Sequence, residues 1–124
     1  MNEGLRDTSE NGAVALAGTG VIGAGFAGRV LSREQISAIA GEAMARVDAD
    51  GRRVLVLVPD GTRTMPMPLI FDLMEAGLGA RSAALDYLVA LGTHPLMSDE
   101  QLGRLVGRPV HGGRAGTSRI FNHR

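Results

Sequence analysis

The sequence contains no cysteine and no lysine, and it has few aromatic residues: three Phe, one Tyr and no Trp among 124 residues. Without cysteine it has no disulfide, no thiolate metal site and no Cys nucleophile. Without lysine it has no Schiff base and no covalent attachment through a side-chain amine. The 13 basic residues are therefore all Arg, and 13 acidic residues balance them. Net charge thus favours neither nucleic acid nor an anionic membrane as a partner.

The chain also lacks membrane and export signals. No apolar stretch reaches the roughly 20 residues of a spanning helix, and the opening Met1-Asn2-Glu3 has no basic character of a signal peptide. We therefore expect a cytoplasmic protein with one modest core. Its expected parts are a disordered tail over residues 1–12, a glycine-rich lead-in over 13–31 and an α/β domain over 32–124.

Helix starts are indicated by two Ser-x-x-Gln sequences that have the spacing of a capping box. A proline and several glycines mark the start and end of another helix. The segments 18–28 and 108–118 are too rich in glycine for regular structure and are expected to be loops. Helices are expected over residues 32–47, from near Pro68 to Gly77 or Gly79, and from Ser98 to Gly107.

The strand signal is strongest at Val54–Val58, an unbroken apolar run typical of a strand buried on both faces of a parallel sheet. Leu85–Leu91 is the next candidate, and Ala13–Ala17 and Arg119–His123 are weaker ones. The two main strands start about 30 residues apart with a helix between them, which is the length of a βαβ unit. The sequence predicts an α/β fold of parallel βαβ units with flanking helices, similar to a Rossmann fold.

This topology places the candidate site. Ligands of open parallel sheets bind beyond the carboxyl ends of the strands. Asp60–Arg63 follows the first main strand, and Gly92–His94 follows the second. We therefore expect Arg63 and His94 to converge at one edge of the sheet.

These residue types suit a small anionic substrate from which a proton must move. The planar guanidinium of Arg63 suits a carboxylate or phosphate, and His94 is the natural general acid or base. Asp60 is expected to orient Arg63 or accept bonds from ligand hydroxyls, and Thr62 offers a hydroxyl and a backbone N–H. A structural alternative stays open: Asp60 forms an Asx turn, Arg63 pairs with it on the surface, and His94 only caps a loop.

Other features indicate no additional function. Residues 18–23 match G-x-G-x-x-G, but the next helix starts too late for a dinucleotide site. Arg residues are frequent near the carboxyl end without aromatic partners for bases, so nucleic acid is not expected. Met65 and Met67 are expected to pack, and His111 and His123 are isolated, so no metal site is expected from this chain.

Two motifs occur together at a fixed spacing: Asp60-x-Thr62-Arg63 after the first main strand and Ala90–His94 after the second. Shorter matches accompany them at Leu31–Gln35, Met97–Glu100 and Asn122–His123. Over residues 29–123 the pattern resembles the amino-terminal domain of the nickel-dependent lactate racemase family.

The resemblance implies an isomerase domain that closes against a second domain over a nickel-pincer nucleotide. Family members interconvert stereoisomers of 2-hydroxy acids by moving a hydride to and from that cofactor, while a His handles the hydroxyl proton. By motif, Arg63 would hold the substrate carboxylate and His94 would be one of two acid–base histidines. Asp60 and Thr62 would lie in the cofactor-facing loop.

Departures from the family pattern indicate a divergent subfamily and leave open whether its substrate is lactate or another 2-hydroxy acid. Thr64 and Arg124 stand where better-known members have Pro and Asp, and Pro95 stands where they often have Arg. The family attaches its cofactor to a Lys and holds nickel with a further His, both beyond the matching region. The chain alone is therefore expected to be inactive, to retain no cofactor and to need a carboxyl-terminal catalytic domain. The alternative is a non-catalytic module that binds small carboxylates or another protein.

Overall fold

The computed structural model describes residues 5–7, 13–16 and 20–123. Contacts divide the chain into two units, Met1–Val47 and Asp48–Arg124. The boundary between the units lies after the first long helix, whereas the sequence predicted a domain boundary before that helix, at residue 32. Each unit is described by itself below.

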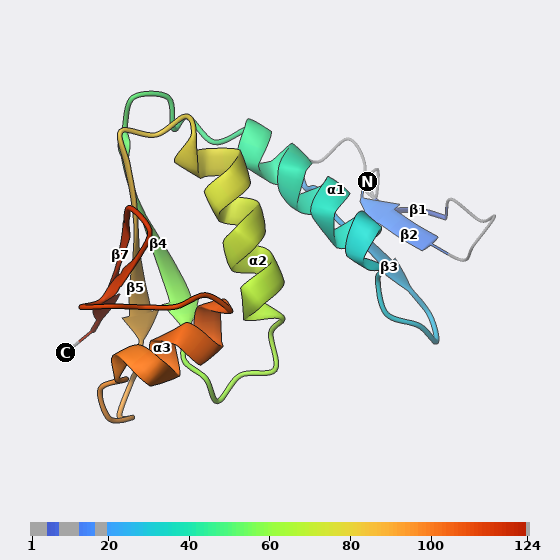
Figure 1. Cartoon of the computed structure of the whole chain (residues 1–124). Coiled ribbons are helices and arrows are strands. Elements are labelled where there is room, and N and C mark those ends of the chain that lie inside the picture. The colour runs from blue at the N-terminus through green and yellow to red at the C-terminus, as the bar shows by residue number, and fades with distance from the viewer. Residues whose placement is uncertain (1–4, 8–12, 17–19, 124) are drawn as a thin grey trace. The chain divides into compact units, whose positions relative to one another are not determined.

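The first unit contains a small antiparallel sheet of three strands in the order β1-β2-β3 (Figure 1). They are β1 (Leu5–Asp7), β2 (Ala13–Leu16) and β3 (Ala24–Phe26). β2 was predicted. The predictions of a disordered tail and a glycine-rich loop are wrong at β1 and β3, because pairing with β2 supplies backbone hydrogen bonds that composition does not reveal.

The three-stranded sheet shows which structure follows the G-x-G-x-x-G match at residues 18–23. Gly18 and Thr19 lie outside the described residues, but Gly20–Gly23 leads into the strand β3. A dinucleotide fingerprint must lead into a helix instead. The described part of the motif therefore lacks the required structural context.

Helix α1 (Arg33–Ala45) begins where the capping box predicted. The backbone N–H of Gln35 donates to Ser32 Oγ at 3.1 Å, and Gln35 Oε1 accepts from the Ser32 N–H at 2.7 Å. The two side chains thus satisfy donors that a helix start otherwise leaves without partners.

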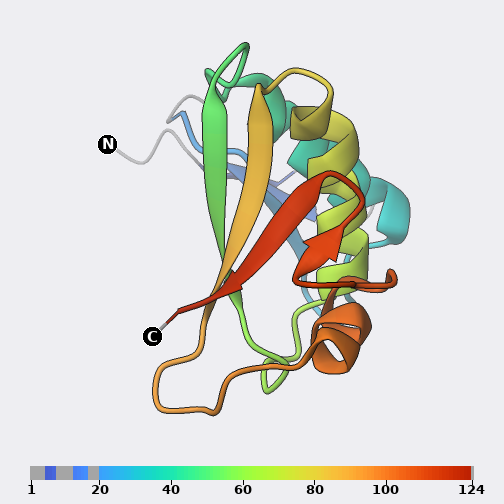
Figure 2. The ribbon, with the colours of Figure 1, turned by 60° about the vertical axis from the view of Figure 1, so that its left-hand side comes forward.

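The second unit is built on a four-stranded sheet in the order β4-β5-β7-β6 (Figure 2). β4 (Arg53–Pro59), β5 (Ala84–Ala90) and β7 (Ser118–Asn122) run parallel, and the two-residue β6 (Arg114–Ala115) pairs antiparallel with β7. The predicted α/β fold with a parallel sheet is confirmed. β6 corrects the prediction of an uninterrupted loop over 108–118, since a tight hairpin with β7 recruits two of its residues.

The prediction that the first main strand is buried on both faces is wrong. Along β4, Val58 is 4% exposed, whereas Leu55 and Leu57 are 56% and 68% exposed. Helix α2 (Met67–Met74) packs on one face of the sheet (Figure 2). The ring centroids of Phe71 on α2 and Tyr87 on β5 are 4.7 Å apart. Successive side chains of a strand point to opposite faces, so alternate residues of β4 lie on the other, open face.

The helices follow the predictions closely. α2 starts one residue before Pro68 and continues as a π-helical turn, η1 (Glu75–Gly79), which ends at one of the predicted glycines. Helix α3 (Asp99–Val106) has the predicted capping box at Ser98 and ends at Gly107. Gly107 has φ +73°, and a Cβ there would lie 2.7 Å from Pro68 Cβ, so both backbone conformation and space require glycine.

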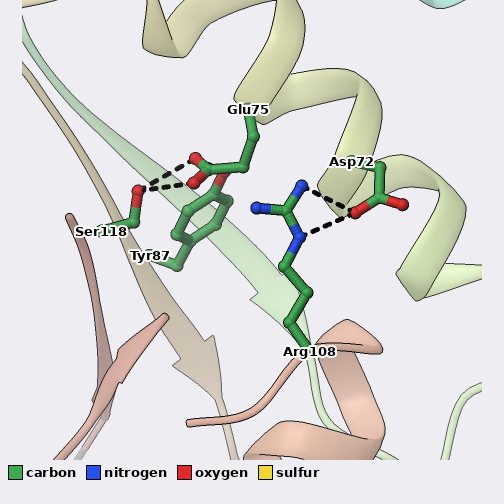
Figure 3. Close-up of polar contacts among 5 residues, drawn as sticks. All are labelled: Asp72, Glu75, Tyr87, Arg108 and Ser118. Carbon is green, nitrogen blue, oxygen red and sulfur yellow. Dashed lines mark hydrogen bonds and ion pairs between the residues drawn. The ribbon is translucent and has the colours of Figure 1, made fainter. Parts of the chain in front are cut away.

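A polar cluster ties the helical layer to the sheet (Figure 3). Tyr87 Oη donates to Glu75 Oε2 at 2.9 Å, and Ser118 Oγ donates to both Glu75 oxygens at 3.0 and 2.9 Å. Arg108 pairs nearby with Asp72, at 3.1 Å from Nε and 3.0 Å from Nη2. Burial, reinforced by the Glu75 carboxylate, raises the pKa of Tyr87 well above its ordinary value.

Candidate functional site

The candidate site lies where the parallel strands end. Because β4, β5 and β7 run parallel, their carboxyl ends lie at one edge of the sheet, and the loops after β4 and β5 lie together beside α3 (Figure 2). A Cβ built on Gly61 in the first loop would lie 3.9 Å from Met97 Cε in the second. The two loops and α3 enclose a cavity of about 510 Å³ that Asp60, Arg63 and His94 all line. The predicted convergence of Arg63 and His94 is confirmed.

Asp60 is the buried anchor of this edge, with 6% exposure. Its Oδ1 accepts from the Thr62 hydroxyl at 2.6 Å and from the Thr62 N–H at 3.1 Å, which makes an Asx turn. The Thr62 hydroxyl is the main reason that the pKa of Asp60 lies below its ordinary value. The Thr62 N–H and the charges of His94 and Arg63 lower that pKa further, while burial opposes them. Asp60 is therefore an ionised, fixed acceptor.

His94 lies next to the second oxygen of this carboxylate. Its Nε2 is 3.7 Å from Asp60 Oδ2, and its side chain is 54% exposed. Its backbone N–H donates to the Leu91 carbonyl at 3.0 Å, which closes the turn after β5. The imidazole thus has a fixed anion on one side and the open cavity on the other.

The pairing of Arg63 is not the one that the structural alternative from the sequence predicted. The Asx turn of that alternative is present, as is the turn at His94, but Arg63 does not pair with Asp60. Among the described residues the Arg63 guanidinium forms no ion pair, although its backbone N–H donates to the Asp60 carbonyl at 3.4 Å. An exposed guanidinium at the cavity wall is thereby available to an anionic ligand.

The sequence pattern included Asn122 but did not predict the contact that it makes. Its Oδ1 accepts from the Met97 N–H at 2.9 Å, and its Nδ2 donates to the Met97 carbonyl at 3.1 Å. This pair of bonds, here called the Asn122 clasp, fixes the far end of the loop that carries His94. A strand over 119–123 was predicted, but not that it lies parallel to β5. That placement would have put Asn122 and His123 at the same edge.

Sequence reasoning also missed the contribution of α3, which adds Gln101, Arg104 and Leu105 to the cavity wall. The helix was predicted from its cap, but its position over the strand ends depends on tertiary packing. Met65 and Met67 both line the cavity. Met67 is buried, as expected for a packing residue, whereas Met65 is exposed.

Metal binding and membrane insertion depend on side-chain clusters and on helix length, respectively, in the part of the chain that the structure describes. No group of three or more His, Asp or Glu residues in that part of the chain has an arrangement that holds a metal ion. Within the same part, no helix combines the length and apolar character needed to cross a membrane.

The fold and site define an open parallel-sheet α/β domain with a cavity at the carboxyl edge of its strands. The lactate racemase N-terminal domain family matches residues 30–124. The chain therefore belongs to that family, as the motifs predicted.

A solved structure supports the fold. The crystal structure of a protein from Thermotoga maritima matches 76% of this chain with a TM-score of 0.63, and the two sequences are 23% identical. The chain spans 22% of that protein's length. No curated protein matches the sequence.

Proposed function

We propose that this domain supplies the carboxylate-binding and proton-transferring half of a site that racemises or epimerises a 2-hydroxy acid. The observation that carries the proposal is the meeting at one cavity of a half-exposed His94 and an Arg63 that forms no ion pair with any other described residue. Membership of the lactate racemase N-terminal domain family supports it.

Arg63 binds the substrate carboxylate in this proposal. A guanidinium presents parallel N–H donors that match the two oxygens of a carboxylate, which fixes the orientation of the ligand as well as its position. With the carboxylate held, the C2 hydroxyl of a small hydroxy acid is directed toward the neighbouring His94. The cavity of about 510 Å³ is large enough for such a ligand.

His94 accepts the proton of the C2 hydroxyl as that group becomes a carbonyl, and returns it when the hydroxyl forms again. The positive imidazolium that results faces the Asp60 carboxylate, whose Oδ2 lies 3.7 Å from Nε2. Because hydrogen bonds from Thr62 keep the pKa of Asp60 low, this carboxylate remains ionised and stabilises the imidazolium. Asp60 acts here as a positioning residue behind His94.

Oxidation at C2 would also need an acceptor for the hydrogen on C2 as hydride, and the family resemblance implies that the nickel-pincer nucleotide would supply that chemistry. This chain does not fit the anchoring of that group, since it has no Lys and its described residues form no metal-binding group. We propose that a carboxyl-terminal catalytic domain holds the cofactor. Asp60 and Thr62 remain predicted as its neighbours; in this structure their side chains bond to each other, and the Asp60 carboxylate faces His94.

The test is a fusion of this domain to the cofactor-loaded carboxyl-terminal domain of a lactate racemase, assayed for interconversion of hydroxy acid enantiomers by chiral chromatography. His94→Ala should reduce turnover about 100-fold or more while lactate binding persists in nitrogen–proton NMR titrations. Arg63→Ala should abolish that binding.

A matched control is Arg52→Ala, which removes an exposed Arg paired with Asp48 rather than one at the cavity. It should change neither binding nor turnover. Binding that needs Arg63, together with turnover indifferent to His94, would favour the alternative of a non-catalytic carboxylate-binding module.

A further inference from the structure

The cavity contains a second cation that the binding of one carboxylate does not use. Arg104 lines it from α3, whereas Arg63 lines it from the loop after β4. Asp60 is the sole acidic residue among the lining residues described. The wall therefore has more positive than negative formal charge.

Asp60 does not neutralise this excess. One of its oxygens accepts two hydrogen bonds from Thr62, and the other faces His94. It forms no ion pair with either Arg63 or Arg104 among the described residues. Both guanidinium groups are therefore still able to bind an anion on a ligand.

The existing partner of Arg104 is weakly held. Arg104 Nη1 lies 2.9 Å from Glu100 Oε1, one turn away on α3, and the two side chains are 66% and 83% exposed. An exposed pair of this kind contributes little because water and salt screen both charges. A ligand anion inside the cavity would compete well for the guanidinium.

Apolar side chains make up much of the remaining wall, namely Met65, Leu91, Leu96, Met97 and Leu105. Such a wall suits the carbon chain of a ligand rather than further charged groups. The arrangement is thus two cationic groups on different elements of one largely apolar cavity.

We infer that the natural ligand carries a second anionic group, a carboxylate or a phosphate, which Arg104 binds while Arg63 holds the 2-hydroxy carboxylate. The inference rests on the proposed function of Arg63 and narrows its substrate class. Lactate, which has a single anionic group, would leave Arg104 with Glu100 alone.

The test is calorimetric or NMR titration of the whole chain with lactate, malate, 2-hydroxyglutarate and 3-phosphoglycerate. We expect at least one of the three ligands with two anionic groups to bind about tenfold more tightly than lactate, the gain typical of one charge-assisted contact. The larger gain identifies whether the second group is a carboxylate or a phosphate.

Variants test whether Arg104 causes the tighter binding of ligands with two anionic groups. Arg104→Gln should remove the preference, so that the ligands with two anionic groups bind no more tightly than lactate, while Glu100→Gln, which frees Arg104, should increase the preference. Arg52→Gln is the matched control, since Arg52 also pairs with an exposed acid four residues away but does not line the cavity. It should leave every affinity unchanged.

The titrations distinguish a failure of the inference about Arg104 from a failure of the proposed function. If lactate binds through Arg63 but the other ligands bind no better, or if their preference survives Arg104→Gln, the inference about Arg104 is wrong and the proposed function stands. If no compound binds, or if Arg63→Gln leaves lactate binding intact, both are wrong.

Discussion

The Asn122 clasp gives the sharpest prediction about the site. Asn122→Ala removes both hydrogen bonds to the Met97 backbone, which are 2.9 and 3.1 Å long. A net contribution of about 0.5–1.5 kcal/mol for each bond predicts a loss of about 2 kcal/mol in the free energy of unfolding. Urea denaturation followed by circular dichroism measures this loss.

The local effect of the same substitution is more specific. The Met97 amide loses its acceptor, so its hydrogen exchange should accelerate toward that of an unprotected amide, while amides in the middle of β5 change only by the global loss of stability. Because the clasp fixes the loop that carries His94, lactate binding should weaken in parallel. Native-state hydrogen exchange by NMR resolves the Met97 amide from the others.

Two further variants act as controls. Asn122→Asp keeps an acceptor for the Met97 N–H but places a carboxylate oxygen against the Met97 carbonyl, so it should not restore stability. His123→Ala should be within about 0.5 kcal/mol of wild type, because the described contact of His123 is made by its backbone N–H. If Met97 exchanges as slowly in Asn122→Ala as in wild type, the clasp does not hold this loop and the reasoning is wrong.

Three other predictions concern individual residues. Gly107→Ala should destabilise the chain by about 1–2 kcal/mol, since φ is +73° and the new Cβ would contact Pro68; an unchanged urea midpoint would contradict this. Tyr87 has a raised pKa, so its contribution to stability is complete below the ordinary value of 10.0 and is lost as pH rises above it. As it is the single Tyr of the chain, tyrosinate absorbance should appear only together with loss of circular dichroism, and ionisation in the folded state would refute the burial argument. Asp60 has a lowered pKa, so its contribution is present above the ordinary value of 3.8 and is lost as pH falls through the lower value of the folded state. The difference in unfolding free energy between wild type and Asp60→Asn should therefore shrink in acid, and a constant difference would count against this role.

Local signals in the sequence predicted the parts of the fold that depend on neighbouring residues. Both capping boxes start helices at the expected serines, Ser32 and Ser98, because cap hydrogen bonds are made within four residues. The main strands and their connection follow from hydrophobic runs and spacing. The same topology argument located the loops of Arg63 and His94 correctly.

Features that depend on distant residues escaped prediction. The exposure of Leu55 and Leu57 depends on which face of β4 the helices cover, and an unbroken apolar run does not carry that information. β3 exists through its pairing with β2, against the glycine content of its surroundings. Asn122 reaches Met97 in the His94 loop only because β7 pairs with β5. Arg104 reaches the cavity only because α3 packs over the strand ends.

The position of β4 also affects how copies of the chain behave at high concentration. Among the described strands β4 pairs on one side only, so its outer backbone groups, next to the exposed Leu55 and Leu57, are a template for edge-to-edge aggregation. The strand begins after Arg52 and at Arg53, and it ends at Pro59. Charge repulsion at one end and a missing N–H at the other both disfavour the addition of a further strand. Pro59, which borders the loop of the candidate site, therefore also helps to protect the domain from aggregation.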